Sequence, residues 1–399
     1  MMDITIYPNK LTGNIDAIAS KSQAHRLLIC AAFSDIPTTL LCSETNQDIE
    51  ATANCLRAIG TDIQRFEDRY VVTPISAIPM TAELDCGESG STLRFILPIV
   101  CALGIEANIR MHGRLPYRPL SPLWEELERM GCVLSRPHDN VIHTSGKLHS
   151  GIFSIASNVS SQFISGLLFA MSLMPGESEL HITGKLESQP YIKMTQHALS
   201  LFGVTTDQYK IRGSVPFHSP GYLQVEGDWS NGAFFLVAKA LGSNLIVNQL
   251  DRNSMQGDRA IDDILPLSMQ CPTVCAANIP DLVPVLAVYF AAKHGAIFTD
   301  IARLRLKESD RVASVINMLT ALSIQATADQ NTMTVTGGQI TGGIVDACGD
   351  HRIAMAAAIA ATVSNGPVTI LGADCVAKSY PAFWLHYKEL GGSYEQYIR

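Results

Sequence analysis

The feature that most constrains the fold of this chain is a pattern that occurs six times along it. Each copy has a few small or polar residues, then an apolar run of helix length, then a short strand-like segment. The six polar heads with their apolar runs read SKSQAHRLLICAAF, GESGSTLRFILPIVCALG, SNVSSQFISGLLFAMSL, EGDWSNGAFFLVAKALG, NIPDLVPVLAVYFAAKHG and CGDHRIAMAAAIAATVS. Recurrence of this kind indicates a chain assembled from one supersecondary unit.

The spacing of the copies shows that one of them is shortened. The intervals between successive starts are 67, 70, 70, 51 and 71 residues, taking the starts as Ser20, Gly87, Ser157, Gly227, Asn278 and Gly349. The strand-like segments that follow the helices are TTLLC, NIRMHG, LHITG, LIVNQL, IFTDI and VTILG. A second, amphipathic helix comes next, and three of these helices are predicted to stop at Gly60, Gly131 and Gly203. We expect a strand pair to be missing between Leu265 and Asn278.

Six units in 399 residues predict two lobes of three units each. The first helix of each unit is too apolar for a surface, so we expect the sheets to wrap around buried helices. The segment HSPGYLQVEGD is the best crossover between the halves, and residues 1 to 19 form a strand that could pair with the second half. The predicted lobes are therefore residues 20–219, and residues 1–19 together with residues 220–399.

Composition excludes several classes of function. The net charge is -8, so overall electrostatics do not favour binding to nucleic acid or to an anionic membrane. The apolar runs are shorter than a membrane span, and the N-terminal residues do not resemble a signal peptide. The ten cysteines include no CxxC pair, which indicates free thiols in a cytoplasmic protein and no zinc site.

Against this acidic background, lysines and arginines recur at the polar heads and in the loops after the strands. A helix N-terminus already carries partial positive charge and unpaired N–H groups, so adding cations there is unfavourable unless an anion binds. Arginine suits bidentate contacts with phosphate or carboxylate, and lysine a point contact. The pattern predicts small, phosphorylated ligands bound between the two lobes. The ordinary alternative for each position alone is a helix cap, a solvated charge or a local ion pair.

Two acids stand out among these cations. Asp281 lies in the apolar segment IPDLVP, where a carboxylate is costly unless it is paired or used. Glu308 lies between Lys307 and Arg311. Acids among anion-binding cations suit general acid–base chemistry on a bound anion. The sequence has no nucleophile elbow, metal-ligand cluster or dinucleotide fingerprint, which argues against hydrolase, metalloenzyme and dehydrogenase functions.

These motifs together resemble those of the EPSP synthase family, the 3-phosphoshikimate 1-carboxyvinyltransferases. The resembling segments span residues 20 to 381 and are SKSQAHR, GESGSTLR, RLPYRPL, VSSQF, ESQPYI, VEGDWSNGAFF, RNSMQGD, LRLKESDR, GDHRIAMA and CVAKSYP. The resemblance implies an α/β fold, a two-domain inside-out barrel of six repeated βαβαββ units. In this chain one unit is shortened before Asn278.

The resemblance also implies a reaction and the residues that serve it. The enolpyruvyl group of phosphoenolpyruvate would pass to the 5-hydroxyl of shikimate 3-phosphate, with release of phosphate and with no metal or organic cofactor. Shikimate 3-phosphate would be held by Lys21, Ser22, Arg26, Ser160, Ser161, Gln162, Ser188, Tyr191, Asp281, Arg303 and Lys307. Phosphoenolpyruvate would be held by Lys21, Gly90, Arg118, Gln162, Glu308, Arg311, His351, Arg352 and Lys378.

Within these sets the resemblance assigns four catalytic residues. Asp281 would accept the proton of the 5-hydroxyl, Glu308 would deliver a proton to the methylene carbon, and Lys307 and Lys21 would contact the developing charge. We expect a monomer whose partners are its two small substrates. The first lobe would serve mainly shikimate 3-phosphate, and the second would serve mainly phosphoenolpyruvate and supply the acid and the base.

The chain departs from the family pattern at several positions. Glu88 and Ser91 replace the usual Asn and Thr of the glycine-rich loop, where an added negative charge could weaken binding of phosphoenolpyruvate or of the inhibitor glyphosate. Arg303 replaces an Asn, and the usual His before Asp281 is absent. Three alternatives therefore stay open at this point. They are a UDP-N-acetylglucosamine enolpyruvyl transferase, an anion-binding homologue without turnover, and a protein related to RNA 3'-end cyclases.

Overall fold

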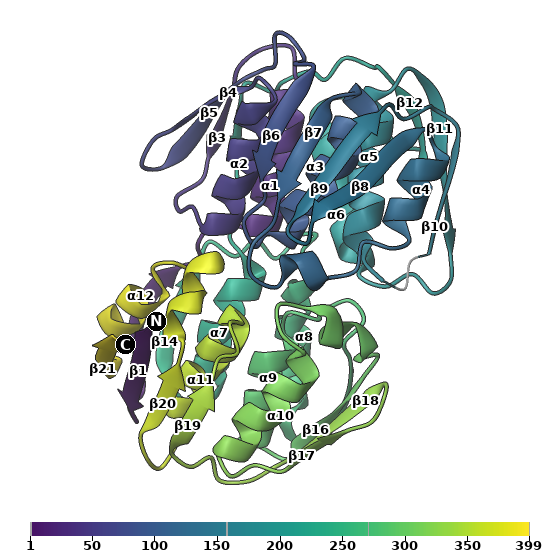
Figure 1. Cartoon of the computed structure of the whole chain (residues 1–399). Coiled ribbons are helices and arrows are strands. Elements are labelled where there is room, and N and C mark those ends of the chain that lie inside the picture. Colours follow the sequence, from purple (N-terminus) through teal and green to yellow (C-terminus); the bar gives the residue numbers. More distant parts are fainter. Residues whose placement is uncertain (1, 157–158, 270, 399) are drawn as a thin grey trace. The chain divides into compact units, whose positions relative to one another are not determined.

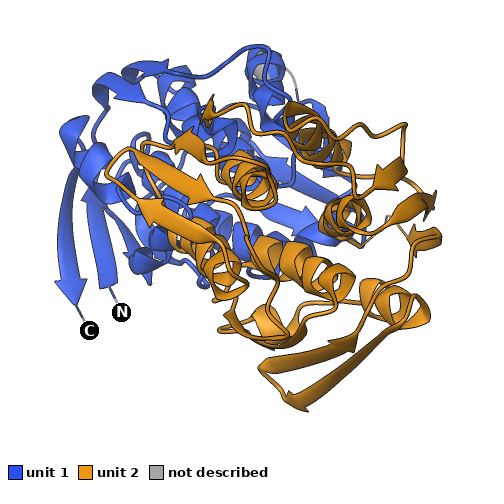
Figure 2. Ribbon diagram, turned by 90° about the horizontal axis from the view of Figure 1, so that it is seen from above, with its two compact units in different colours: residues 1–18, 226–399 blue, residues 19–225 orange. Residues whose placement is uncertain are grey.

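The computed structural model describes residues 2–156, 159–269 and 271–398 (Figure 1). The chain divides into two compact units: unit 1 is Met1–Ile18 with Glu226–Arg399, and unit 2 is Ala19–Val225 (Figure 2). These boundaries lie one and six residues from the predicted ones. Ser157, the predicted start of the third repeat, lies outside the described residues.

Unit 2 contains the first three repeats. Its helices are α1 (Lys21–Ala32), α2 (Gln47–Ala58), α3 (Gly90–Leu103), η1 (Leu115–Tyr117), α4 (Leu123–Arg129), α5 (Ser161–Leu173) and α6 (Gln189–Leu201). Its strands are β3 (Thr38–Leu41), β4 (Asp62–Arg65), β5 (Arg69–Thr73), β6 (Thr81–Asp85), β7 (Glu106–Arg110), β8 (Cys132–His138), β9 (Val141–Gly146), β10 (Ile152–Ala156), β11 (Gly176–Thr183), β12 (Lys210–Gly213) and β13 (Tyr222–Gln224).

Unit 1 contains the N-terminal strands and the last three repeats. Its helices are α7 (Trp229–Ala240), η2 (Gly257–Ala260), α8 (Ile261–Ile264), η3 (Leu265–Met269), α9 (Val283–Ala291), η4 (Ala302–Leu306), α10 (Arg311–Ala321), α11 (His351–Ala361), η5 (Ala373–Lys378) and α12 (Phe383–Glu389). Its strands are β1 (Met2–Tyr7), β2 (Thr12–Asp16), β14 (Asn244–Asn248), β15 (Thr273–Cys275), β16 (Gly295–Thr299), β17 (Ala326–Ala328), β18 (Thr332–Thr336), β19 (Gly343–Asp346), β20 (Val368–Leu371) and β21 (Ser393–Ile398).

The described residues form six sheets, three in each unit, which agrees with six repeats. Unit 2 has the strand orders β13-β3-β5-β4, β6-β7-β9-β8 and β10-β11-β12, and unit 1 has β14-β2, β15-β16-β18-β17 and β19-β20-β1-β21. The six predicted strand segments are confirmed as β3, β7, β11, β14, β16 and β20. In four sheets the strands before and after the first helix pair in parallel, as a strand–helix–strand unit requires.

The other two sheets exchange strands where the chain passes between the units. Strand β2 precedes α1 but pairs in parallel with β14, so that Ile15 lies opposite Val247. Strand β13 precedes α7 but pairs in parallel with β3, so that Leu223 lies opposite Leu40. The N-terminal strand β1 lies between β20 and β21, which is the place of the last hairpin strand in the complete sheets. Pairing of the N-terminal residues with the second half is thus confirmed.

The fourth repeat is the short one, as predicted. Its sheet has two strands among the described residues, whereas four of the other sheets have four. After α7 and β14 the chain forms η2, α8 and η3, and within the described part it then enters β15, the first strand of the next sheet. The stretch between Leu265 and Asn278, where a strand pair was expected to be missing, therefore contains β15, the strand that opens the fifth repeat.

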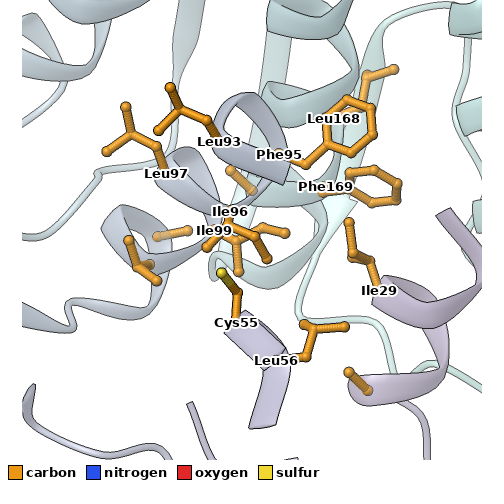
Figure 3. Close-up of a cluster of buried hydrophobic side chains, with 14 of the residues drawn as sticks. Ile29, Cys55, Leu56, Leu93, Phe95, Ile96, Leu97, Ile99, Leu168 and Phe169 are labelled. Atoms are coloured by element: carbon orange, nitrogen blue, oxygen red, sulfur yellow. The ribbon is translucent and has the colours of Figure 1, made fainter. Parts of the chain in front are cut away.

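The first helices of the repeats form the two cores, with α1, α3 and α5 in unit 2 and α7, α9 and α11 in unit 1. Every residue of α9 and of α11 is buried. Figure 3 shows how Ile29, Leu56, Phe95 and Leu168, from α1, α2, α3 and α5, pack together in unit 2. No helix in the described ranges has the length and apolar composition needed to cross a membrane.

The polar heads act as helix caps in five of the six repeats. The side chain that accepts the backbone N–H comes from Ser20, Ser89, Ser160, Asp228 and Asp350 for α1, α3, α5, α7 and α11. Such a cap satisfies one of the donors left open at a helix N-terminus. The capping interpretation of these heads is therefore correct for the backbone, and it leaves the neighbouring cations to be explained.

Helices α3 and α5 approach each other closely at Gly166. A Cβ atom at this position would overlap the backbone carbonyl oxygen of Arg94, and it would lie 3.1 Å from Cγ of Pro98. Because the overlapped atom belongs to the backbone of α3, the helix cannot move aside without disturbing the core. A glycine is therefore required here by packing rather than by its own conformation.

We predict that Gly166→Ala lowers the stability of the protein. Overpacking of a core costs about 1–3 kcal/mol, which exceeds the ~1 kcal/mol that alanine gains over glycine in a helix. Gly232→Ala in α7 is the matched control, because its added methyl meets only movable side-chain carbons of Leu250. In urea unfolding, Gly166→Ala should unfold at a lower urea concentration than the wild type, and the control should unfold at no lower a concentration than the wild type. A Gly166→Ala protein as stable as the wild type would contradict this account of the crossing.

Candidate functional site

In unit 2 the first turns of α1 and α2 are joined by an ion pair. Lys21, the first residue of α1, places its Nζ 2.8 Å from Oδ2 of Asp48, the second residue of α2. The two side chains are 15% and 16% exposed, so the pair is accessible from solvent at one end. The carboxylate fixes the Lys21 ammonium at the N-terminus of α1, where an anion would need it.

Arg26 has a different environment from the one predicted for a solvated or acid-paired arginine. It is buried, and its Nε donates to Thr195 Oγ1 at 2.8 Å, while Nη2 donates to the carbonyl of Tyr191 at 3.0 Å. Its guanidinium also lies over the ring of Phe95, 5.1 Å from the centroid. Burial lowers the pKa of Arg26 to about 10. Arg26 therefore ties α1 to α6, whatever else it contacts.

The glycine-rich loop places Gly90 beneath two guanidinium groups. A Cβ atom at Gly90 would lie 2.8 Å from Nη1 of both Arg94 and Arg118. Arg94 donates to Oε1 of Gln162 at 2.7 Å, and Nε2 of Gln162 donates to Ser91 at 2.8 Å. The first turns of α3 and α5 are thus linked through Gln162, which the sequence assigned to the site, together with Arg94 and Ser91. Any side chain larger than hydrogen at Gly90 would displace Arg94 or Arg118.

Ser22 is the second residue of α1, and its carbonyl accepts from Nη1 of Arg26. The other remaining predicted residues of unit 2 lie at the starts of α5 and α6. Ser160 caps α5, and Ser161 is buried as the first residue of that helix. Ser188 precedes α6 in a left-handed conformation with φ of 55°, a strained position for a non-glycine residue. Tyr191 is half-buried on the first turn of α6 and accepts the Arg26 bond through its backbone.

Glu88 points toward the neighbouring loop. The side chain is exposed, and a Cβ atom on Gly113 would overlap its carboxyl group. The carboxylate therefore lies against the loop that leads to Arg118. Ser91, the other departure in this loop, accepts the hydrogen bond from Gln162 described above.

In unit 1 a single buried arginine joins three carboxylates. Nη1 of Arg311 lies 2.7 Å from Asp281, Nη2 lies 2.6 Å from Glu308, and Nε lies 2.9 Å from Asp350. The Arg311 side chain is only 1% exposed and that of Asp350 is fully buried. Burial opposes the charge of Arg311, but the three carboxylates outweigh it and raise its pKa above the usual range. This cluster assembles the starts of α9, α10 and α11.

The environment of Asp281 holds it ionised. Its carboxylate lies 3.3 Å from Nη2 of Arg352 and 3.8 Å from Nζ of Lys307, in addition to Arg311. Burial opposes ionisation, yet Arg352, Lys307 and Arg311 together hold the pKa of Asp281 well below its usual value. Burial also lowers the pKa of Lys307 to about 8, although Asp281 acts in the opposite direction. Lys307 can therefore change its charge near neutral pH.

Three further predicted residues surround this cluster. Lys378, at the end of η5, donates from Nζ to the carbonyl of Gly349 at 3.1 Å, just before the cap of α11. His351 is buried as the first residue of α11. Arg303 is half-buried in η4, close enough to Lys307 for its charge to lower the pKa of that lysine. The predicted residues of unit 1 thus lie at or just before the starts of α9, α10 and α11, except Arg303 in η4 and Lys378 at the end of η5.

Sequence reasoning missed several residues that shape these two sites. Asp48 and Thr195 anchor Lys21 and Arg26. Asp350 lies in the polar head of the sixth repeat, but the sequence did not assign it to the site, where it completes the Arg311 cluster. Asp258, in η2, is buried, and burial together with the charge of Asp281 raises its pKa to about 7. Asp350 could have been found from its position directly before HR in the motif GDHR. No sequence signal pointed to Asp48 or Thr195, because their partners Lys21 and Arg26 lie far away in the sequence.

We predict that Arg311→Met destabilises the protein by about 3–5 kcal/mol at about pH 7, because it leaves buried carboxylates without a counter-charge. Because its pKa is low in the folded protein, ionised Asp281 stabilises the fold at pH values above about 4, the pKa of an aspartate in the unfolded chain. This contribution to stability is lost as the pH falls below that value. The deficit of Arg311→Met should therefore narrow below about pH 4. Urea unfolding of the wild type and of Arg311→Met, at about pH 7 and below about pH 4, measures this difference in stability.

Arg305→Met serves as the control for this measurement. Arg305 belongs to the same segment, and its pair with Asp310 is 3.4 Å long and partly exposed. Loss of an exposed pair is worth about 1 kcal/mol or less. Equal stability losses in the two variants, or a deficit of Arg311→Met that is the same at both pH values, would contradict the assignment of Arg311 as the centre of a buried charge cluster.

Comparison with known proteins places the chain in a family. A family model described as EPSP synthase (3-phosphoshikimate 1-carboxyvinyltransferase) matches residues 6–271 and 266–386, and the two segments meet within the shortened repeat. Relatives named 3-phosphoshikimate 1-carboxyvinyltransferase are 34% identical in Clostridium beijerinckii and 36% identical in Clostridium acetobutylicum. The alignments cover 100% and 99% of this chain and 99% and 98% of those proteins.

A solved structure of EPSP synthase from Acinetobacter baumannii shares the fold, with a TM-score of 0.81 at 22% identity and full coverage of both chains. The predicted architecture, a two-domain inside-out α/β barrel, is confirmed by this likeness. The matches in sequence extend over the whole chain, including the helix starts that carry the two clusters. The chain therefore belongs to the EPSP synthase family.

Proposed function

We propose that the chain transfers the enolpyruvyl group of phosphoenolpyruvate to the 5-hydroxyl of shikimate 3-phosphate, releasing phosphate. The observation that carries this proposal is the environment of Asp281, a carboxylate held among Arg311, Arg352 and Lys307. Such a group can accept a proton beside cations that bind a phosphate and a carboxylate. The names of the relatives support the identity of the two substrates.

Shikimate 3-phosphate binds mainly through the starts of α1, α5 and α6 in this proposal. Serine hydroxyls and the N-terminal N–H groups of these helices suit a phosphate. The guanidinium of Arg26 already donates to Thr195 and Tyr191 of α6, so Arg26 holds α1 against α6. In this proposal it also faces the ligand. The proposed contacts are Lys21, Ser22, Arg26, Ser160, Ser161, Gln162, Ser188, Tyr191, Asp281, Arg303 and Lys307.

Phosphoenolpyruvate binds through guanidinium and ammonium groups. Arg118 lies over Gly90, and Arg311 and Arg352 are already directed at Asp281, so a second carboxylate or a phosphate meets donors that are in place. Preorganised donors of this kind stabilise developing negative charge without a cost of reorganisation. The proposed contacts are Lys21, Gly90, Arg118, Gln162, Glu308, Arg311, His351, Arg352 and Lys378.

Glu308 as the acid and Asp281 as the base act on the two reactants of the same addition step. Glu308 gives a proton to the methylene carbon, the 5-hydroxyl oxygen attacks the neighbouring carbon, and Asp281 takes the hydroxyl proton. In the elimination, the carboxylate of Glu308 takes a proton back from the methyl group, the electron pair of that C–H bond forms the new double bond, and phosphate leaves as its carbon–oxygen bond breaks. Asp281 is a weak base while Arg311 and Arg352 face it. Anionic substrate groups that bind these guanidiniums raise the basicity of Asp281 when the site is loaded.

Two further properties belong to this proposal. The reaction needs no metal or organic cofactor, since the cations that stabilise charge come from side chains. We also propose a cytoplasmic monomer. The ten cysteines are free thiols, which supports a reducing compartment.

The experiment that tests the proposal is phosphate release by the purified protein. Release is expected only when shikimate 3-phosphate and phosphoenolpyruvate are both present. Release with UDP-N-acetylglucosamine in place of shikimate 3-phosphate would contradict the proposed substrate. Tight binding of shikimate 3-phosphate without any release would instead show a homologue that has lost turnover.

We predict that Asp281→Ala lowers kcat by about a hundredfold or more, because general base catalysis contributes about 10²–10⁴. The dissociation constant of shikimate 3-phosphate, measured by calorimetry, should change far less. Asp263→Ala, at an exposed position of α8, is the matched control and should leave both quantities unchanged. Near-normal turnover by Asp281→Ala would remove this carboxylate from its catalytic role.

A second prediction concerns the pH dependence of kcat/KM for shikimate 3-phosphate, the substrate that Lys307 contacts in this proposal, because this ratio reports groups of the free enzyme. The pKa of Lys307 is about 8, so the ammonium form that contacts substrate is complete below this pH and is lost above it. The basic limb should lie near pH 8, and Lys307→Arg should move it upward because arginine stays charged. Lys388→Arg, at an exposed position, should leave the limb in place. An unmoved limb in Lys307→Arg would contradict this assignment.

A further inference from the structure

A row of buried polar groups runs beneath the helix starts of unit 2. Nδ1 of His25 lies 2.7 Å from Oγ1 of Thr52, which lies 2.7 Å from Oγ1 of Thr92, which lies 2.8 Å from Oγ of Ser89. All four residues are at most 1% exposed. The row joins α1, α2 and the cap of α3, and nothing in the proposed reaction uses His25.

The donors in this row run in one direction. Thr92 Oγ1 is within 3.3 Å of the carbonyl oxygen of Asp48, which can only accept, and within 2.8 Å of Ser89 Oγ. A hydroxyl has one hydrogen, and that of Thr92 is directed at Ser89 Oγ and at the Asp48 carbonyl. In its contact with Thr52, Thr92 therefore accepts the hydrogen bond. Thr52 has then used its own hydrogen, and it accepts one from Nδ1 of His25. The imidazole therefore carries its proton on Nδ1.

The other ring nitrogen shows that His25 is neutral. Nε2 is buried and has no hydrogen-bond partner among the residues that the structure describes, so a second proton there would have no acceptor within them. Burial, and then the charges of Lys21 and Arg26, lowers the pKa of His25 well below its usual value. A buried nitrogen without a partner is costly, whereas an apolar side chain of similar size would fill the same space without that cost. Packing alone does not account for an imidazole here.

The row ends on groups that the proposed function assigns to anion binding. Lys21 begins α1 and pairs with Asp48, whose carbonyl oxygen accepts from Thr92. Ser89 caps α3, so its position sets that of Gly90, the first residue of the helix. A shift of the row would therefore move the Lys21 ammonium and the N–H groups at the start of α3 relative to each other.

We propose that His25 is a positioning residue, which holds the starts of α1, α2 and α3 in register through Thr52 and Thr92 so that Lys21 and Gly90 face one anion. This inference rests on the proposed function, in which both residues bind phosphoenolpyruvate. His25 does not contact the substrate. Its contribution is a single N–H donor directed at Thr52.

The test compares His25→Leu, which removes the donor, with His25→Asn, whose amide N–H can replace that of Nδ1. His25→Leu should raise the KM for phosphoenolpyruvate by about tenfold or more with a smaller change in kcat, since a small misplacement of binding groups has effects of this size. His25→Asn should retain the wild-type KM. Ile29→Val is the packing control from the same face of the core, and it should lower the melting temperature and leave KM unchanged.

Thr52→Val provides a second break in the row should His25→Leu fail to fold. It should raise the KM for phosphoenolpyruvate as His25→Leu does, and the double variant should be no worse than either single one. An unchanged KM in His25→Leu or Thr52→Val, or His25→Asn as impaired as His25→Leu, would overturn the positioning role.

A separate readout distinguishes this inference from the proposed function. Wild-type protein that releases no phosphate from the two substrates contradicts the proposed function. Binding of phosphoenolpyruvate measured by calorimetry then tests the positioning role without turnover. The expected order is wild type equal to His25→Asn and tighter than His25→Leu, and equal affinities of all three proteins would overturn the role.

Discussion

Burying six helices that are apolar on nearly every side is the constraint on which the rest of this structure depends. Such a helix cannot lie on one face of a single sheet, because its outer side would remain exposed. Three helices per unit, enclosed by three sheets, solve this problem within each unit. The arrangement requires close approach inside, as at Gly166, and it brings the polar heads of the helices out of the core at their N-termini.

Those N-termini explain why charged residues recur in an acidic protein. The caps satisfy backbone N–H groups, and the cations beside them are held by internal acids: Lys21 by Asp48 and Arg311 by three carboxylates. A charge held in this way is ready to meet an anion, and it also shifts the pKa of its partners. The low pKa of Asp281 follows from this crowding of charge, whereas burial is the main cause that lowers the pKa of Lys307 to about 8.

The repeat allowed much of the fold to be predicted, because periodic apolar runs determine which segments are buried. It indicated the six central strands, the short fourth unit and the pairing of the N-terminal residues with the second half. The same pattern placed most of the predicted site residues at helix starts, although Arg118, Arg303 and Lys378 lie elsewhere. The bonds of Arg26 could not be predicted, since Thr195 lies 169 residues away and α6 meets α1 only after folding. The orientation of Glu88 toward Gly113 likewise depends on a loop from elsewhere in the chain.

In enolpyruvyl transfer, phosphate leaves when the bond between carbon and the bridging oxygen of phosphoenolpyruvate breaks. The most direct measurement supplies shikimate 3-phosphate and phosphoenolpyruvate that carries a heavy oxygen isotope at the bridging position. Mass spectrometry then locates the label among the products. Addition followed by elimination predicts that the released phosphate carries the label. Unlabelled phosphate, with the heavy oxygen retained in the three-carbon product, would contradict enolpyruvyl transfer by this protein.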